Sequence, residues 1–278
     1  MGPSGGHGGA AWPPPRHPFC AVGTPFAMAH RGFSLDGREN SLAAFAAAAD
    51  LGLTHVETDV RCTADGVLVA FHDDRLDRVT DSVGLLAETS WDRVARARIG
   101  GREAVPRFEE VLAAFPQLRI NVDCKVAEAV EPLAEVVRRT RSAERLLITS
   151  FSERVRQAVV TAAHSSAGRV ATSVGSARVA AVLAAARAGS RFGVRAALAG
   201  ADALQIPVRT HVLGMSVPVV TERLVELVHA GGAQVHCWTI DDPVQMSALL
   251  DLGVDAVITD RADLARAELL RRGGPGPS

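Results

Sequence analysis

The sequence alternates strand-like runs with alanine- and leucine-rich helical runs. Eight runs are rich in β-branched and large apolar residues, and all but the second directly precede such a helical stretch or a loop that leads to one. They are FAMAHRG (26–32), HVETDV (55–60), RINVDCKV (119–126), LLITSF (146–151), GRVATSV (168–174), ALQIPV (203–208), AQVHCWTI (233–240) and DAVITD (255–260). Strands that alternate with helices predict a parallel sheet, and eight such units favour closure into a (β/α)8 barrel, the TIM-barrel fold.

The chain reads as one domain, over residues 25–270, because no second low-complexity linker interrupts it. Residues 1–24 and 271–278 are rich in Gly and Pro, and we expect both to be flexible tails. The rhythm is broken only after the second strand, where VLVAFHD (67–73) and an irregular stretch to Pro106 replace the expected helix. Such an insertion lies on the catalytic face of a barrel.

Composition excludes several classes of function. Hydrophobic residues make up 47% of the 278 residues, enough for a sizeable core, and 30 basic residues face 31 acidic ones. A sequence-independent nucleic-acid binder would carry a basic excess, so no nucleic-acid partner is expected. The start lacks the pattern of a signal peptide, no apolar stretch would span a bilayer, and the four cysteines form no CxxC pair. We expect a soluble, cytoplasmic protein without stable membrane association; its oligomeric state does not follow from the sequence.

Charged residues lie near the ends of the predicted strands, where a barrel carries its active site. Glu57 and Asp59 share one face of the second strand, because side chains alternate along a strand. A divalent cation would remove the repulsion between them, and Asp123 on the third strand is a candidate third ligand. Oxygen ligands suit Mg²⁺ or Ca²⁺. The alternative is an ion-pair network with Arg61 and Lys125.

Two histidines follow strand-like runs and are candidate acid and base catalysts. His30 and His72 could exchange protons near neutral pH, although a single histidine at a strand end is more often structural. Arg31 offers a planar fork for phosphate oxygens. Lys125 shares the inward face with Asp123 and could stabilise negative charge, or simply pair with a carboxylate. Trp238 could contact a ligand at the pocket mouth or belong to the core.

Together these motifs resemble the glycerophosphodiester phosphodiesterase family. The motifs are AHRG (29–32), REN (38–40), ETD (57–59), FHD (71–73), NVDCK (121–125), WTID (238–241) and GVDAVITD (253–260), and the resemblance covers about residues 26–264. It implies a TIM barrel that hydrolyses glycerophosphodiesters to an alcohol and sn-glycerol 3-phosphate.

The resemblance also assigns roles by position. It implies His30 and His72 as the acid–base pair, Arg31 and Lys125 as phosphate-binding residues, and Glu57 and Asp59 as metal ligands. Glu39 and Asn40 match the family's Glu-Asn element, in which Glu39 either supports the ligands from behind or makes a contact on the ligand side. One departure stands out: Asp123 occupies a position that is commonly Glu, so the cation must shift or a water must bridge.

We therefore expect a metal-dependent phosphodiesterase with a small-molecule substrate. One histidine would deprotonate water or the neighbouring glycerol hydroxyl, and the other would protonate the leaving alcohol. Two alternatives remain: a lysophospholipase D-like enzyme that acts on lipid-sized diesters, and a barrel that binds phosphodiesters without catalysis. The insertion and the stretch QIPVRTHVLG (205–214) are expected to select the head group.

Overall fold

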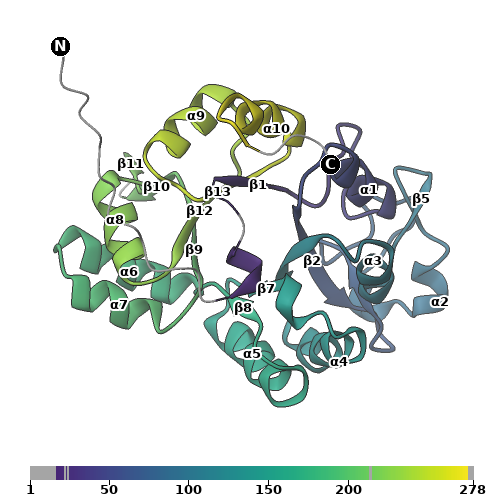
Figure 1. Cartoon of the computed structure of the whole chain (residues 1–278). Coiled ribbons are helices and arrows are strands. Elements are labelled where there is room, and N and C mark those ends of the chain that lie inside the picture. Colours follow the sequence, from purple (N-terminus) through teal and green to yellow (C-terminus); the bar gives the residue numbers. More distant parts are fainter. Residues whose placement is uncertain (1–16, 22, 24, 213–214, 275–278) are drawn as a thin grey trace, which may run out of the picture.

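A computed structural model describes residues 17–21, 23, 25–212 and 215–274 of the chain, and it has the predicted barrel (Figure 1). Eight strands are hydrogen-bonded in parallel, in the order β8-β7-β6-β2-β1-β13-β12-β9. They are β1 (Phe26–Ala29), β2 (His55–Cys62), β6 (Arg119–Cys124), β7 (Leu146–Thr149), β8 (Ala171–Thr172), β9 (Ala203–Pro207), β12 (Gln234–Trp238) and β13 (Ala256–Thr259). The prediction of a (β/α)8 barrel is confirmed.

Asp202 joins the two ends of this ladder. Its backbone N–H donates to the carbonyl of Thr172 over 2.7 Å, and its carboxylate accepts from the Thr172 N–H over 3.1 Å. The carbonyl of Asp202 accepts from the N–H of Gln234 over 2.9 Å. Asp202, the residue that directly precedes β9, therefore connects β8 to β12. This connection compensates for the shortness of β8.

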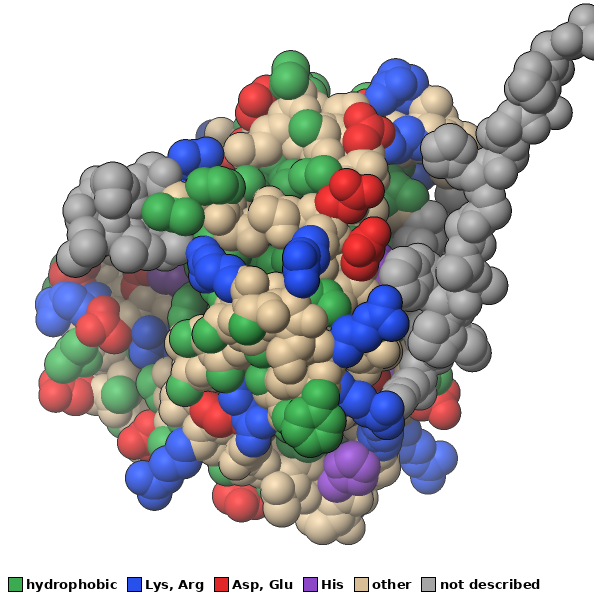
Figure 2. Space-filling view, turned by 90° about the vertical axis from the view of Figure 1, so that its left-hand side faces the viewer, with side chains coloured by type: hydrophobic (Ala, Val, Ile, Leu, Met, Phe, Trp, Pro, Cys, Tyr) green, Lys and Arg blue, Asp and Glu red, His purple; other side chains and the backbone are tan. Residues whose placement is uncertain are grey.

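Helices surround the strands, as Figure 1 shows. They are α1 (Leu42–Asp50), α3 (Phe108–Ala114), α4 (Val130–Thr140), α5 (Glu153–Ala167), α6 (Ser176–Arg187), α7 (Arg191–Leu198), α8 (Glu222–Ala230), α9 (Pro243–Asp251) and α10 (Ala262–Arg271). Outward strand residues such as Val56 and Ile120 are fully buried beneath them. On the face shown in Figure 2, positive and negative side chains are interspersed. Among helices of the described residues, none combines the length and apolarity needed to cross a bilayer.

Glycines follow the ends of three of these helices. Gly52, Gly232 and Gly253 all have positive φ, a conformation that glycine adopts without strain. After Gly52, the N–H of Leu53 donates back to the carbonyl of Ala48, five residues earlier. This bond satisfies a carbonyl that the end of α1 would otherwise leave unpaired.

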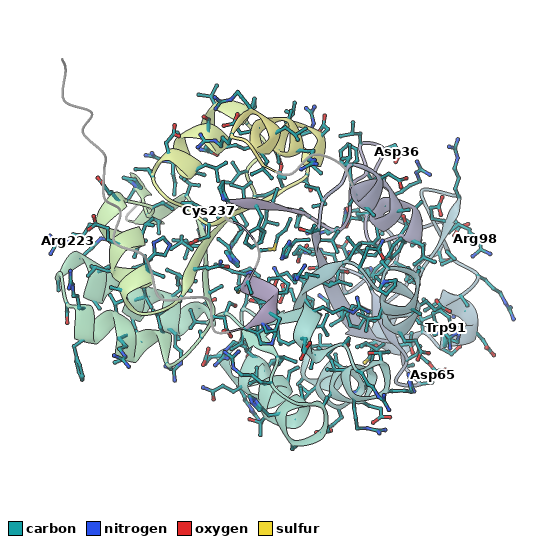
Figure 3. All side chains as sticks on the ribbon, in the orientation of Figure 1. Asp36, Asp65, Trp91, Arg98, Arg223 and Cys237 are labelled. Carbon is teal, nitrogen blue, oxygen red and sulfur yellow. The ribbon has the colours of Figure 1, made fainter. Side chains whose placement is uncertain are left out.

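The insertion after β2 forms a small subdomain with its own apolar cluster. β3 (Leu68–Ala70) runs antiparallel to β2, and η2 (Leu86–Glu88), α2 (Trp91–Val94) and the hairpin of β4 (Arg98–Ile99) and β5 (Glu103–Ala104) follow. The N–H of Trp91 donates to Asp65, and both residues are labelled in Figure 3. In the predicted 205–214 loop, β10 (Arg209–Val212) pairs with β11 (Met215–Pro218), and residues 213–214 lie outside the described part.

The N-terminal end of the barrel is closed by residues that the sequence had placed in a flexible tail. Pro18–Cys20 form a short 3₁₀ helix, η1, and the side chain of Phe19 is completely buried against His55. In Figure 1 this purple segment fills the centre of the ring. The predicted tail boundary at residue 24 is thus wrong for 17–21, because apolar side chains there cap the core. Residues 1–16 and 275–278 of the predicted tails lie outside the described residues.

Candidate active site

A cavity of about 490 Å³ opens at the carboxyl ends of the strands. Eight predicted site residues line it: His30, Arg31, Glu57, Asp59, His72, Asp123, Lys125 and Trp238. The other two, Glu39 and Asn40, lie behind that lining. The barrel therefore brings all ten residues to one end, some from strand ends and some from the loops that follow them.

The three carboxylates come from neighbouring strands. Asp59 on β2 is in register with Asp123 on β6, and Glu57 lies one inward position below Asp59. All three side chains are almost fully buried. Lys125 lies between the two aspartates, with Nζ 2.8 Å from Asp59 Oδ1 and 2.5 Å from Asp123 Oδ2. The ion pair considered for Lys125 is present, whereas Arg61 donates to the carbonyl of His72.

The cluster brings three buried carboxylates together beside the cations Lys125 and Arg31. Burial, reinforced by the Asp59 carboxylate, raises the pKa of Glu57 well above its usual range. Burial also raises the pKa of Asp123, although Lys125 opposes it. Burial would raise the pKa of Asp59 too, but the charges of Lys125 and Arg31 outweigh burial and lower it. An additional cation would therefore stabilise the ionised forms.

The donor set suits a hard cation, but the side chains are not arranged around one. All the candidate ligands are oxygen donors, and the buried Oδ1 of Asp123 has no hydrogen-bond partner in the described structure. Within the described ranges, no three His, Cys, Asp or Glu groups are positioned to hold a metal ion together. Metal binding would require the Lys125 ammonium to leave its place between Asp59 and Asp123.

His30 follows β1 and is oriented by a carboxylate that follows the neighbouring strand, β13. Its Nδ1 lies 2.7 Å from Oδ1 of Asp260, which follows β13, and its Nε2 lies 3.9 Å from Glu57. Burial alone would lower the pKa of His30. The hydrogen bond to Asp260 and the negative charge of Glu57 outweigh burial and raise this pKa above its ordinary value.

His72 follows β3 and has a matching arrangement. Its Nδ1 lies 2.6 Å from Oδ1 of the adjacent Asp73. As at His30, a carboxylate occupies Nδ1 and favours the tautomer whose Nε2 is available to a ligand. Two histidines prepared in the same way thus border one cavity, as a reaction with one proton donor and one proton acceptor requires.

Arg78 of the insertion connects the His72 side of the site to Arg31. Its guanidinium contacts Asp73 at 2.5 and 3.0 Å and Glu39 at 2.6 and 3.0 Å. Glu39 in turn accepts from Nη1 of Arg31 over 2.8 Å. Hydrogen bonding to Arg78 lowers the pKa of Asp73 to about 2. The insertion therefore holds both carboxylates that support the ligand-facing side chains.

Asn40 and Trp238 complete the surroundings. Asn40 has positive φ, donates to Oδ2 of Asp59 over 3.1 Å and accepts from the hydroxyl of Thr58 over 2.7 Å. It supports the carboxylate from behind, in the place that the sequence predicted. Trp238 ends β12 and packs edge-on against Phe151, with ring centroids 5.8 Å apart. These two rings form an aromatic wall of the cavity.

Comparison with known proteins decides the family. A model described as the glycerophosphoryl diester phosphodiesterase family matches residues 30–264. The chain belongs to the glycerophosphoryl diester phosphodiesterase family. It is 43% identical over 256 residues to a probable glycerophosphodiester phosphodiesterase 2 of Mycobacterium tuberculosis, covering 92% of this chain and 94% of the relative. A glycerophosphodiester phosphodiesterase of Caldanaerobacter subterraneus is 25% identical over 262 residues, covering 89% and 98% of the two chains.

Solved structures share the fold of this phosphodiesterase. A glycerophosphodiester phosphodiesterase from Agrobacterium tumefaciens superposes with a TM-score of 0.71 at 23% identity, covering 87% of this chain and 99% of that one. An Oleispira antarctica phosphodiesterase, solved in complex with the product sn-glycerol-3-phosphate, gives a TM-score of 0.69 at 23% identity, with coverages of 88% and 97%.

Sequence reasoning had not assigned several residues that the phosphodiesterase places in or behind the cavity. Asp73 and Asp260 were visible in the FHD and VITD motifs, but nothing in the pattern showed that each holds a histidine. Arg78 lies in an irregular segment without periodicity, so no signal pointed to it. Asn121 and Gln205 lie at inward positions of β6 and β9. Strand alternation places Asn121 on the same face as Asp123 and Lys125, but it assigned no role to Asn121, and it could have found Gln205.

Proposed function

We propose that this phosphodiesterase hydrolyses glycerophosphodiesters to sn-glycerol 3-phosphate and an alcohol, with His30 and His72 as the acid–base pair and with a divalent cation. One observation carries the proposal: two histidines border the same cavity, each with Nδ1 held by a carboxylate at 2.6–2.7 Å. That arrangement prepares both Nε2 atoms for proton transfer to or from a bound ligand.

The non-bridging phosphate oxygens would be bound by Arg31 and Lys125, which both line the cavity. Arg31 is held by Glu39, and its Nε lies 3.2 Å from Asp59, so its fork is already oriented. Glu57, Asp59 and Asp123 would hold Mg²⁺ or Ca²⁺, which when bound would supply positive charge to the phosphate oxygens.

We assign His30 as the acid and His72 as the base. Asp260 and Glu57 favour the protonated imidazolium of His30, which is the form that gives a proton to the leaving oxygen. His72 takes the proton of the nucleophile, which is water or the neighbouring glycerol hydroxyl. The new oxygen–phosphorus bond forms as the bond from phosphorus to the alcohol oxygen breaks. Attack by the glycerol hydroxyl would give a cyclic phosphate, which water then opens.

The proposal is tested by measuring sn-glycerol 3-phosphate released from glycerophosphocholine, with and without EDTA and added Mg²⁺ or Ca²⁺. A lysophosphatidylcholine in parallel distinguishes the lysophospholipase D-like alternative. We expect release from glycerophosphocholine, its loss in EDTA and its return with the cation. A preference for the lysophospholipid would favour the alternative, and no hydrolysis of either would favour a binding barrel. We propose the cytoplasm as the location, since Cys20, Cys62, Cys124 and Cys237 are all free thiols, which fits a reducing compartment.

A further inference from the structure

Asn121 has a buried amide without a partner. Its side chain points inward from β6, is only 1% exposed and lines the cavity. Neither Oδ1 nor Nδ2 has a hydrogen-bond partner among the described residues. Leaving a buried amide unpaired costs about 1–3 kcal/mol, and native structures rarely tolerate it without a ligand or water. The amide is therefore placed to bind something that enters the cavity.

Asn121 lies where the charged part of the cavity meets an apolar cluster. In the β-ladder it lies between Glu57 on one side and Leu147 on the other. Leu147, Met28 and Ile258 belong to one buried cluster inside the barrel. This depth is one inward position below the pair of Asp59 and Asp123. A ligand that reaches Asn121 must extend past Asp59 and Asp123 to this level, which we call the floor of the cavity.

Gln205 on β9 supplies a second polar group, and a chain of hydrogen bonds fixes its orientation. The chain starts at the backbone carbonyl of Cys20 in η1, which can only accept and receives the Nε2 amide of Gln234 over 3.3 Å. Oε1 of Gln234 then accepts from Nε2 of His236 over 3.1 Å. Burial lowers the pKa of His236 to about 4, so its ring is neutral and Nδ1 is an acceptor.

The last link defines what the cavity receives. Nδ1 of His236 accepts from the Nε2 amide of Gln205 over 3.3 Å. One N–H of the Gln205 amide is used there, so the orientation of the amide is fixed, and its Oε1 and its second N–H are left for a ligand. The floor thus offers an oriented acceptor and one donor on Gln205, and the acceptor and two donors of Asn121. A hydroxyl group, which both donates and accepts, is the matching ligand chemistry.

We propose that Asn121 and Gln205 bind the terminal hydroxyl of the glycerol moiety, the one farthest from the phosphate; this rests on the proposed glycerophosphodiesterase function. The hydroxyl donates to Gln205 Oε1 and accepts from Asn121 Nδ2. Successive inward positions on a strand are about 7 Å apart, comparable with an extended glycerol chain. A phosphate held by Arg31 and Lys125 at the carboxylate level therefore places the far hydroxyl at this floor.

The test compares two diesters on wild-type enzyme and on Asn121→Leu and Gln205→Leu. The substrates are glycerophosphocholine and its analogue without the terminal hydroxyl, the phosphocholine diester of propane-1,2-diol. Wild type should lose about tenfold or more in kcat/KM on the analogue, because the floor amides are then left unpaired. Each variant should lose a similar factor on glycerophosphocholine and little on the analogue. Gln157→Leu, on the surface of α5, is the matched control and should change neither rate.

Two results would overturn the inference. One is equal loss in the variants on both substrates, which would mean that the amides only support the fold or another part of the site. The other is a wild-type enzyme that cleaves both diesters at the same kcat/KM, a result that does not depend on whether the variants fold. In either case the glycerophosphodiesterase function stands. An enzyme inactive on both diesters in the presence of Mg²⁺ or Ca²⁺ would instead refute the proposed function, and this inference with it.

Discussion

Nδ1 of His30 lies 2.7 Å from Oδ1 of Asp260, so a carboxylate after the last barrel strand orients a histidine after the first. β1 and β13 are adjacent in the barrel. Two residues that lie far apart in the sequence therefore form one of the shortest contacts in the site. The pairing leaves Nε2 of His30 facing Glu57 and the cavity. Asp260 is therefore expected to control both the orientation and the proton affinity of the catalytic imidazole.

Asp260→Asn should shift the alkaline side of the pH profile of kcat/KM to lower pH. As the acid, His30 is active below its pKa and inactive above it, and the loss of the Asp260 charge lowers that raised pKa. The rate at neutral pH should fall about tenfold to hundredfold, as for other residues that orient a catalytic ligand. Asp242→Asn, at the N-cap of α9, is the control. An unchanged alkaline limb would refute the assignment of His30 as the acid.

Arg78→Ala should lower kcat/KM about tenfold, because Asp73 and Glu39 would lose the guanidinium that holds both in place. Steady-state kinetics and a thermal melt would be measured together. Arg75→Ala is the matched control, since the Arg75 side chain pairs with Asp77 at the surface of the same segment. If the two variants had the same kcat/KM, the contacts of Arg78 with Asp73 and Glu39 would have no role in catalysis.

Mg²⁺ or Ca²⁺ should raise the melting temperature of the protein after EDTA treatment and removal of the chelator. A cation that binds only the folded state stabilises it by about 2.7 kcal/mol at a hundredfold excess over Kd. Asp123→Asn should weaken or abolish the shift, because it removes one of three proposed ligands. Glu135→Gln, in an exposed ion pair on α4, should retain it. A wild-type melting temperature insensitive to both cations would contradict the metal site.

Glu153 should make the fold sensitive to acid. Burial opposes its ionisation, but hydrogen bonds from Arg156 and from the N–H of Gly175 outweigh burial and lower the pKa of Glu153 to about 2. The stabilisation is complete above the unfolded-state value near 4.5 and is lost as the pH falls towards 2. Glu153→Gln should cost about 1–3 kcal/mol of unfolding free energy at pH 7, and less at low pH.

Urea unfolding at several pH values would measure this effect. Glu135→Gln is again the control, since its ion pair is exposed and should contribute little. Glu153 is relevant to the active site because its partner Gly175 directly precedes Ser176, which lines the cavity. If Glu153→Gln and wild type had the same free energy of unfolding at pH 7, the bonds to Gly175 and Arg156 would make no net contribution to stability.

The alternation of side chains along a strand made part of the site predictable from the sequence. It placed Glu57, Asp59 and Asp123 on one inward surface, because period-two patterning survives in a buried parallel strand. It could not show that Lys125 would lie between two of them, since a long side chain can turn either way. Arg78 was also out of reach, because irregular segments leave no periodic signal. The burial of Phe19 could not be predicted, because the sequence around it is rich in Gly and Pro. Its burial depends on the tertiary structure, in which Phe19 closes the open end of the barrel.

The central claim is that His30 and His72 perform acid–base hydrolysis of a glycerophosphodiester. The most direct measurement is the rate of sn-glycerol 3-phosphate release from glycerophosphocholine by wild type, His30→Ala and His72→Ala, with circular dichroism to confirm that all three are folded. The account predicts clear release by wild type and a loss of about 10²–10⁴-fold in each folded variant. A folded variant that kept near wild-type rates would contradict the claim for that histidine.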